Sequence, residues 1–411
     1  MKIWRVPYRK FGAGSGLARV VAIAERLELD LTCFGARGAA IVGTNGKGST
    51  AAMAAALLQQ TGASVGLFTS PHLFALNERF RVDGEDIGDA ELAYHWARVV
   101  AAADEAGLSE QLGGFEFLFL IAADWFAARA CAHTIWEAGI GGRLDTVRLI
   151  QARRLALTSL DLEHTELLGD TLEDIARDKL GAAPEGATVF VSDSCSPQRQ
   201  VIEAHCATRG VSAVFVGAET LDRFTPPLRG AHQRNNAALA VAIARDIKAD
   251  ALGGDEIARG LAATRWPGRL EVINDEPLIV IDVGHTPAAI RVALEGFNAL
   301  RGARPGVLVC GASHDKDAVA MIAALAPGFG VIACASALHK GAPAAAIAAY
   351  ASAANPSAEI ACAANLAEAR ALALTHARAL GGAIYVAGGL FLAAEFKAVH
   401  LGRDPASLAF F

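Results

Sequence analysis

The segment from Ala39 to Gly62, AAIVGTNGKGSTAAMAAALLQQTG, constrains the fold of this chain more than any other stretch. A short apolar run enters a glycine-rich turn around Lys47 and continues as an alanine-rich helical pattern. Glycines let backbone N–H groups converge on an anion, and the N-terminus of the following helix adds positive potential. The stretch predicts a strand, a helix and, between them, a phosphate-binding loop formed by Thr44, Asn45, Gly46, Lys47, Gly48, Ser49 and Thr50.

The loop departs from the strict Walker A spacing, because position 41 is Ile and Gly48 separates Lys47 from Ser49. The lysine and the two flanking elements still indicate nucleotide binding. Phosphate binding alone does not distinguish a kinase, a hydrolase, a motor protein or a ligase, so the residues downstream have to decide.

Short apolar runs alternate with amphipathic stretches along the rest of the chain, which predicts an α/β fold with a mostly parallel sheet covered by helices. Further strands are expected within 64–69, 132–139, 154–160 and 187–193, and helices within 49–60, 89–107 and 115–130. A second series places strands within 278–284, 305–312, 330–336 and 383–389, and helices within 286–300 and 365–380.

The length of 411 residues exceeds what one ordinary core takes, so two domains are expected. The Trp266-Pro267-Gly268 turn is a plausible break, because Pro and Gly separate elements. We place an N-terminal domain with the phosphate-binding loop at 1–272 and a smaller C-terminal domain at 273–411.

Charge and cysteine usage narrow the class of protein. The net charge is −6 and there is no basic block, which argues against a nucleic-acid partner. The seven cysteines are scattered without a CxxC pair, as expected of free thiols in a reducing compartment. The first residues lack the apolar core of a signal peptide, and no uncharged apolar run reaches the roughly 18 residues of a membrane span. We expect a cytoplasmic protein with no membrane partner.

The spelling GTNGKGST at 43–50 resembles the Mur ligase superfamily, and VGLFTSPHLFALNERFRVDGE at 65–85 is similar to the folylpolyglutamate synthase and dihydrofolate synthase family. The resemblance continues in family order through GGFEFLF, EAGIGGRLD, LTSLDLEHTELLGDTLEDIARDK, RGAHQRNNAALA, WPGRLE, DVGHTP and VAGGLFLAAE. It implies a Mur-ligase-type ATPase domain followed by a Rossmann-like domain that closes over ATP and binds the amino acid.

The resemblance also implies a chemistry. These enzymes are ATP-dependent, ADP-forming ligases that join L-glutamate to the carboxylate of a folate- or pterin-like acceptor. A carboxylate is a poor electrophile, so transfer of the γ-phosphoryl group first makes an acyl phosphate, which an amine can attack. The implied partners are small molecules (ATP, an amino acid and a carboxylic acid), with Mg²⁺ at two sites, and members of the family are commonly monomeric.

The family's functional residues carry over onto matching positions of this chain. Ser70, Glu137 and His164 match magnesium ligands, and Lys179 matches a lysine that the family carbamylates to hold a second Mg²⁺. Asn236 matches an adenine contact, and Arg269, Asp282 and His285 match groups that reach the ATP phosphates and ribose. The implied catalytic set is Lys47, His164, Lys179, Arg269 and His285.

Each of these residues also has a purely structural alternative. Glu137 could form an ion pair, His164 could be an ordinary loop histidine, and Ser70 could cap a turn. Lys179 could be a solvated lysine on a helix face. Asn236 could cap a helix, and Asp282 could end a strand.

Several positions depart from the family pattern. Glu163 stands where the family usually has Asp, Asp161 where it has a small residue, and Thr286 where it has Asn. Arg148 adds a cation near a possible carboxylate site, although it could equally form a surface ion pair. These changes beside intact ATP and metal positions suggest a specialised paralogue with another carboxylic acid acceptor, and drift within a folate enzyme is the alternative explanation. A nucleotide-binding regulatory protein that has lost catalysis and a P-loop kinase that releases a phosphorylated product are the alternatives from other classes.

Overall fold

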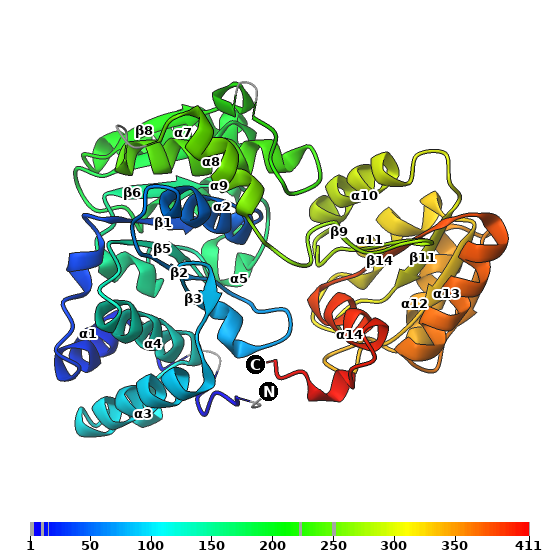
Figure 1. Ribbon diagram of the computed structural model, residues 1–411, viewed down its shortest axis with the longest axis horizontal. Helices are drawn as coiled ribbons and strands as arrows, with labels where there is room; N and C mark the ends of the chain where they lie inside the picture. The colour runs from blue at the N-terminus through cyan, green and yellow to red at the C-terminus, as the bar shows by residue number, and fades with distance from the viewer. Residues whose placement is uncertain (1–3, 10–11, 15, 222–223, 249–251, 411) are drawn as a thin grey trace.

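The computed structural model describes residues 4–9, 12–14, 16–221, 224–248 and 252–410, which form two α/β lobes, each built around its own sheet (Figure 1). The strands of the N-terminal lobe are β1 (Gly38–Val42), β2 (Val65–Phe68), β3 (Phe80–Val82), β4 (Glu85–Asp86), β5 (His133–Glu137), β6 (Arg154–Leu157), β7 (Thr188–Ser192) and β8 (Ser212–Val216). Its helices are α1 (Leu17–Arg26), α2 (Lys47–Gln59), α3 (Asp89–Glu105), α4 (Gly114–Ala128), α5 (Thr165–Leu168), α6 (Leu172–Leu180), α7 (Arg199–Thr208), α8 (His232–Ile247) and α9 (Gly254–Ala263).

The sheet of the N-terminal lobe has eight strands in the order β4-β3-β2-β5-β1-β6-β7-β8. The pairs from β2 to β8 are parallel, and the short β3 and β4 add an antiparallel edge. The carboxyl ends of β1, β2, β5 and β6 therefore meet at one edge, where open α/β sheets place their ligands.

Helix α2 explains the alanine-rich composition after the loop. Its residues from Gly48 to Leu58 are all buried, between the sheet on one side and α8 and α9 on the other. Alanine side chains allow helices to approach closely, so the run AAMAAA suits a helix that is covered all round. The helix that presents the phosphate-binding loop is thus rigidly embedded.

The C-terminal lobe has six strands in the order β13-β12-β11-β14-β10-β9, parallel except for the β9–β10 pair. Its strands are β9 (Glu271–Asp275), β10 (Leu278–Ile281), β11 (Gly306–Cys310), β12 (Val331–Cys334), β13 (Glu359–Cys362) and β14 (Ala383–Ala387). Its helices are α10 (Pro287–Arg301), α11 (Ala318–Leu325), α12 (Ala344–Ala354), α13 (Leu366–Leu380) and α14 (Leu390–His400).

The structure confirms the expected fold class, an α/β protein with mostly parallel sheets, and each strand and helix expected above is present. Strands β3, β4, β8, β9 and β13 were not among those expected. The second sheet begins with β9 at Glu271, two residues before position 273, where the domain boundary was expected. In the part of the chain that the structure describes, no helix has the length and apolar character needed to cross a membrane.

Candidate active site

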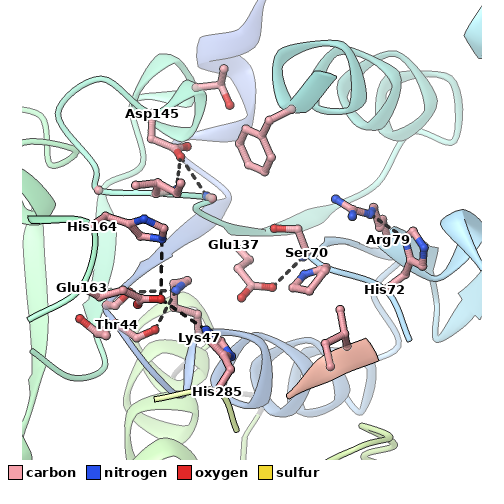
Figure 2. Close-up of a pocket in the computed structure, with 18 of the residues that line it drawn as sticks. Thr44, Lys47, Ser70, His72, Arg79, Glu137, Asp145, Glu163, His164 and His285 are labelled. Atoms are coloured by element: carbon pink, nitrogen blue, oxygen red, sulfur yellow. Dashed lines mark hydrogen bonds and ion pairs between the residues drawn. The ribbon is translucent and has the colours of Figure 1, made fainter. Parts of the chain in front are cut away.

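A cavity of about 700 Å³ lies between the two lobes and is lined by residues of both. The N-terminal lobe contributes the phosphate-binding loop and the carboxyl ends of its central strands, and the C-terminal lobe contributes the turn after β10. Figure 2 shows Glu137 and Ser70 near the middle of the group, with Arg79 and His72 to one side and Lys47, Glu163 and His164 to the other. The cavity therefore brings together segments that are far apart in sequence.

The predicted phosphate-binding loop follows β1 and ends in α2, as expected. Gly46 is the residue before the helix and has φ 86°, a left-handed conformation that glycine adopts without strain. The ammonium of Lys47 donates to the loop carbonyls of Gly43 (2.9 Å) and Thr44 (3.1 Å). The lysine side chain thus folds back over the loop, while the N–H groups of Thr44 and Asn45 donate to Ser159 at 2.9 and 2.8 Å.

Gly48 accounts for the departure from Walker A spacing. A Cβ atom at this position would overlap the indole of Trp266, which lies in the linker between the lobes. Trp266 also lines the cavity, and the guanidinium of Arg81 lies 5.4 Å from its ring. The extra glycine after Lys47 therefore lets the interlobe linker pack directly on the start of α2.

We predict that Gly48→Ala loosens this packing. The added methyl group has to displace the indole or shift the loop, which costs about 1–3 kcal/mol of stability and weakens binding of an ATP analogue about tenfold. Thermal unfolding and calorimetric titration with AMPPNP check both effects. Gly330→Ala is the matched control, because a Cβ there meets nothing within 4 Å. Equal behaviour of the two variants would contradict the role given to Gly48.

Glu137 places a buried carboxylate at the end of β5. Its Oε2 accepts the backbone N–H of Ser70 at 2.9 Å, and its exposed fraction is 4%. Burial raises the pKa of Glu137, while Lys47, the Ser70 hydrogen bond, Arg269 and Arg79 oppose that rise. The carboxylate thus faces several cationic groups in the cavity, an environment in which negative charge from phosphates and a compensating metal ion can be accommodated.

Arg79 and His72 line the cavity on the same side as Ser70 (Figure 2). The Nε of Arg79 donates to Nδ1 of His72 at 2.9 Å, and both side chains are buried. Burial, together with the charge of Arg79, lowers the pKa of His72 to about 3, and burial lowers the pKa of Arg79 to about 10. His72 is therefore neutral and carries its proton on Nε2. Neither residue was singled out from the sequence.

Lys179 lies at the end of α6 and is 4% exposed, so the alternative of a solvated surface lysine is wrong. Burial lowers the pKa of Lys179 from 10.5 to about 7, the charge of Lys47 adds to this effect, and Glu163, Asp178 and Asp145 oppose it. An amine with this pKa is partly neutral at physiological pH. The neutral amine is the form that the predicted carbamylation requires.

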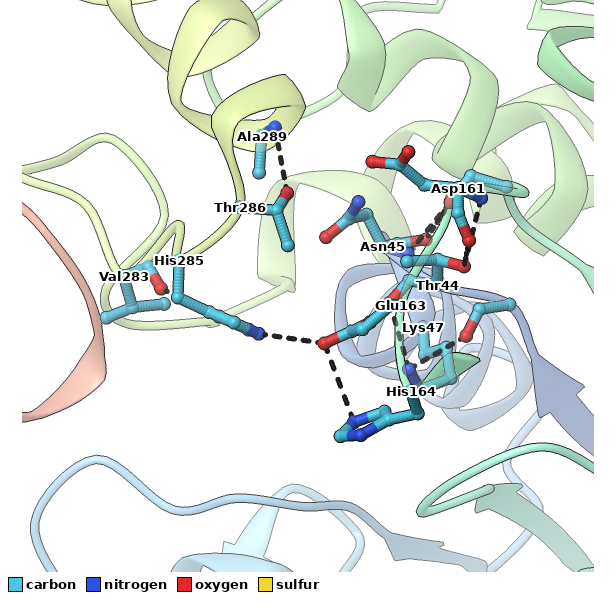
Figure 3. Close-up of polar contacts among 12 residues, drawn as sticks. Thr44, Asn45, Lys47, Asp161, Glu163, His164, Val283, His285, Thr286 and Ala289 are labelled. Carbon is cyan, nitrogen blue, oxygen red and sulfur yellow. Dashed lines mark hydrogen bonds and ion pairs between the residues drawn. The ribbon is translucent and has the colours of Figure 1, made fainter. Parts of the chain in front are cut away.

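Glu163 joins the two lobes across the cavity (Figure 3). Its Oε1 lies 3.3 Å from Nε2 of His285 and 3.6 Å from Nε2 of His164. Burial raises the pKa of Glu163, but the hydrogen bond and charge of His285, with the charges of Lys47 and His164, bring that pKa down to about 2. Glu163, which replaces the family's usual Asp, therefore lies near Lys47 of the phosphate-binding loop and forms a contact between the two lobes.

Asp161 and Arg148 are not among the described residues that line the cavity. The Asp161 backbone exchanges hydrogen bonds with the hydroxyl of Thr44 (3.2 and 3.3 Å), which ties the phosphate-binding loop to the segment after β6. Arg148 donates to the backbone carbonyl of Arg143 at 3.1 Å. Thr286 caps α10 by accepting the N–H of Ala289.

The structure places part of the predicted set on the cavity wall and part behind it. The lining residues include Thr44, Lys47, Ser70, Glu137, His164, Lys179, Arg269 and His285. The described lining does not include Asn45, Gly46, Gly48, Ser49, Thr50, Asn236 or Asp282. Asn236 donates to Gln233 Oε1 at 2.9 Å, and Asp282 accepts the N–H groups of Leu270 and Gly284 at 3.1 and 2.7 Å. Their roles toward ATP remain predictions.

Part of the cavity lining is apolar. Phe115, Ile140 and Leu144 form this part, and the carboxylate of Asp145 also lines the cavity. Burial raises the pKa of Asp145 to about 6, against the N–H groups of Val147, Ile140 and Gly139 and the charge of Lys47. These residues were not named as site residues, although they lie within the motifs GGFEFLF and EAGIGGRLD.

No group of three or more His, Cys, Asp and Glu side chains suited to a metal ion occurs among the described residues. The predicted metal set contains only one carboxylate and one imidazole, with a hydroxyl and a lysine. A carbamylated Lys179 and phosphate oxygens would supply the missing anionic oxygens, which are the ligands that Mg²⁺ prefers.

Comparisons with known proteins agree with this architecture. The family described as "Mur ligase, glutamate ligase domain" matches residues 268–390. The folylpolyglutamate synthase of Lacticaseibacillus casei is 32% identical over 320 residues, which cover 71% of this chain and 74% of that protein. A probable bifunctional folylpolyglutamate synthase/dihydropteroate synthase of Haloferax volcanii is 34% identical over 330 residues, or 73% of this chain. The chain spans only 39% of the length of that relative.

Two solved structures are similar over nearly their whole length. Mycobacterium tuberculosis folylpolyglutamate synthase complexed with ADP and AMPPCP superimposes with a TM-score of 0.85 at 25% identity, covering 95% of this chain and 96% of that one. The bifunctional folylpolyglutamate synthase/dihydrofolate synthase with Mn, AMPPNP and L-glutamate bound has a TM-score of 0.79 at 28% identity and 95% coverage of both chains. The chain therefore belongs to the folylpolyglutamate synthase/dihydrofolate synthase family of Mur ligases.

Proposed function

We propose that this protein is an ADP-forming ligase that joins L-glutamate to the carboxylate of a folate- or pteroate-type acceptor through an acyl phosphate. The observation that carries the proposal is one cavity lined by Lys47, Glu137 and Lys179 of the N-terminal lobe, Arg269 of the linker and His285 of the C-terminal lobe. A relative of this chain holds AMPPNP, Mn and L-glutamate together.

The cationic residues of the cavity bind the phosphates and the transferred group. Lys47 and the N-terminus of α2 bind the phosphates of ATP, and Arg269 approaches them from the linker as a bidentate donor. An acceptor carboxylate oxygen attacks the γ-phosphorus, and ADP leaves. The amine of glutamate then attacks the acyl carbon, which expels phosphate and forms the amide. Since negative charge gathers around the transferred group, fixed cations in a buried site stabilise it.

Magnesium fits the donor set at the end of β5. The carboxylate of Glu137 is buried, faces the cavity and has its pKa raised by desolvation, so a cation there would offset the cost of its charge. Ser70, His164 and a carbamylated Lys179 would complete two such sites. A bound Mg²⁺ would neutralise phosphate charge and orient the transferred group.

The acceptor fits the part of the cavity wall formed by Phe115, Ile140 and Leu144. Phe115 presents a flat ring packed against Gly139, where a Cβ would lie 3.0 Å from two ring carbons. A flat heterocycle between Phe115 and Leu144 would point its carboxylate tail toward Lys179 and the phosphates. The two lobes then enclose the reacting ends and exclude water, which would otherwise hydrolyse the acyl phosphate.

We predict that Phe115→Ala raises the KM for the acceptor about tenfold and leaves the KM for ATP unchanged, because stacking on an aromatic face contributes on the order of 1 kcal/mol. Initial rates with each substrate varied in turn check this split. Phe115→Tyr keeps the ring and serves as the control. A parallel rise in both KM values would show that Phe115 supports the fold rather than the acceptor.

Acceptor-dependent phosphate release tests the proposed function directly. Dihydropteroate, tetrahydrofolate and a panel of other carboxylic acids are compared in the presence of ATP, Mg²⁺ and L-glutamate, and mass spectrometry identifies the product. Turnover with dihydropteroate or tetrahydrofolate and a glutamyl product supports the proposal. Turnover with another acid alone would establish the specialised paralogue instead, and a phosphorylated product that accumulates without an amide would indicate a kinase.

A further inference from the structure

The chain after α14 returns from the C-terminal lobe to the N-terminal lobe (Figure 1). Leu408 is 7% exposed and belongs to the hydrophobic cluster of the C-terminal lobe. The next residue, Ala409, accepts a hydrogen bond on its carbonyl from Nε2 of His72 at 2.7 Å. Residues 403–410, called here the C-terminal strap, are therefore held by both lobes at once.

Phe410 of the strap is surrounded by aromatic rings from both lobes. Its ring stacks on His72 of the N-terminal lobe, with centroids 5.7 Å apart and an interplanar angle of 3°. His339 and Phe391 of the C-terminal lobe contact it edge-on at 4.9 and 4.8 Å. Offset stacked and edge-on pairs are the favourable aromatic geometries. Phe410 also lines the cavity, so the strap forms part of its wall.

The loop that the strap contacts is the one that carries Ser70. Leu73 of this loop is 6% exposed and is buried in the same cluster of the C-terminal lobe as Leu408. The ring of Phe74 lies 5.2 Å from the ammonium of Lys397 and 5.8 Å from the guanidinium of Arg403. The Ser70–Phe74 loop belongs to the N-terminal lobe by sequence, yet the C-terminal lobe and the strap hold it from one side.

His72 connects the strap to the site. Its Nδ1 accepts from Arg79, so its Nε2 must donate, and the carbonyl of Ala409 receives that proton. Moving the strap away would leave a buried N–H without its partner and uncover one face of the imidazole, and both changes are unfavourable. His72 lies two residues after Ser70, whose N–H donates to Glu137 at 2.9 Å.

We propose that the C-terminal strap is a positioning element that couples the arrangement of the two lobes to the geometry of the Ser70–Phe74 loop. Phe410 and Ala409 act through His72, which both of them contact. The consequence for metal and phosphate binding rests on the proposed function, whereas the mechanical coupling of the lobes does not.

The mechanical part can be measured without turnover. Cys33 in the N-terminal lobe and Cys362 in the C-terminal lobe are exposed, and the other five cysteines are buried, so thiol-reactive spin labels attach one probe to each lobe. Pulsed electron resonance then gives the distribution of interlobe distances. We expect Phe410→Ala to raise the population with separated lobes about tenfold, equivalent to about 1.4 kcal/mol. Phe410→Tyr keeps the ring and should restore the narrow distribution.

Tyr94→Ala is the matched control, because it removes an aromatic side chain that is 60% exposed on α3 and is not among the described residues of the cavity wall. The melting temperature of each variant is measured first. If Phe410→Ala unfolds, Phe410→Leu takes its place, since it keeps apolar volume but loses the flat ring. An interlobe distribution that is the same in wild type and in the Phe410 variant would overturn the proposal.

Calorimetric titration with AMPPNP and Mn²⁺ tests the effect on the site. We expect the affinity of Phe410→Ala to fall about tenfold, with Phe410→Tyr close to wild type. A lower melting temperature with unchanged affinity and unchanged distances would make the strap a passive stabiliser and contradict the proposal. If the Phe410 variant changes the interlobe distances but the wild-type protein ligates no glutamate, the proposal for the strap stands and only the proposed function is refuted.

Discussion

Lys47→Ala is expected to lower kcat/KM for the ligase reaction by about a thousandfold while the protein stays folded. Its ammonium donates to the loop carbonyls of Gly43 and Thr44 at 2.9 and 3.1 Å. When ATP binds, the ammonium would turn from these carbonyls to the phosphates. Without it, no side chain of the loop carries a positive charge, and the charge that develops on the transferred phosphoryl group is less stabilised. Rates of phosphate release and the circular dichroism spectrum check the two halves of the prediction.

Lys248→Ala is the control for this variant, because Lys248 follows α8, away from the loop. It removes the same charge from the protein as a whole and should retain wild-type turnover. If Lys47→Ala kept full activity, the phosphate-binding role of the loop would have to be abandoned.

Lys179→Ala is expected to lower turnover by about a hundredfold, because it removes the group proposed to become a metal-binding carbamate. A short carboxylate such as acetate, which can occupy the vacated space and supply anionic oxygens, should restore part of the activity. Lys179→Arg retains a cation but cannot form the carbamate, so it should stay inactive. Activity of Lys179→Arg near that of the wild type would show that a positive charge is what the site needs.

The lowered pKa of Lys179 gives this residue a defined pH dependence. Only the neutral amine reacts with carbon dioxide, so with a pKa of about 7 the reactive fraction rises as the pH passes from 6 to 8. In buffer depleted of carbon dioxide, added bicarbonate should therefore restore activity more fully at pH 8 than at pH 6. Electron density that extends beyond Nζ of Lys179 would give the direct observation; density that ends at Nζ under bicarbonate saturation would refute the modification.

The same shift affects stability. The amine has a pKa of 10.5 when unfolded and about 7 in the folded protein, so the unfolded state binds more protons between these values. The contribution of Lys179 to the free energy of unfolding thus increases as the pH rises from about 7 toward 10.5 and is least favourable below 7. Lys179→Met should remove this pH dependence, as urea unfolding at several pH values can show.

The strands that the sequence did not indicate are either at a sheet edge or very short. β8, β9 and β13 lie at the edges of their sheets and are mostly exposed or half-buried, and β3 and β4 are only three and two residues long. The predicted strands are instead continuous apolar runs in the interior of a parallel sheet, buried on both faces. A central strand therefore has a strong sequence signal, whereas an edge strand depends on its neighbour for its hydrogen bonds.

The sequence by itself determined the α/β class, the strand–loop–helix that presents Lys47, and the family to which the ordered motifs belong, because each of these is encoded in short contiguous patterns. Only the tertiary structure decided that Glu163 meets His285, 122 residues away, that Trp266 packs on Gly48, and that Ala409 meets His72, 337 residues away. These contacts join the two lobes, and their existence depends on how separately folded units dock. No local periodicity or spacing carries that information, since the partners become neighbours only when both sheets and the linker are in place.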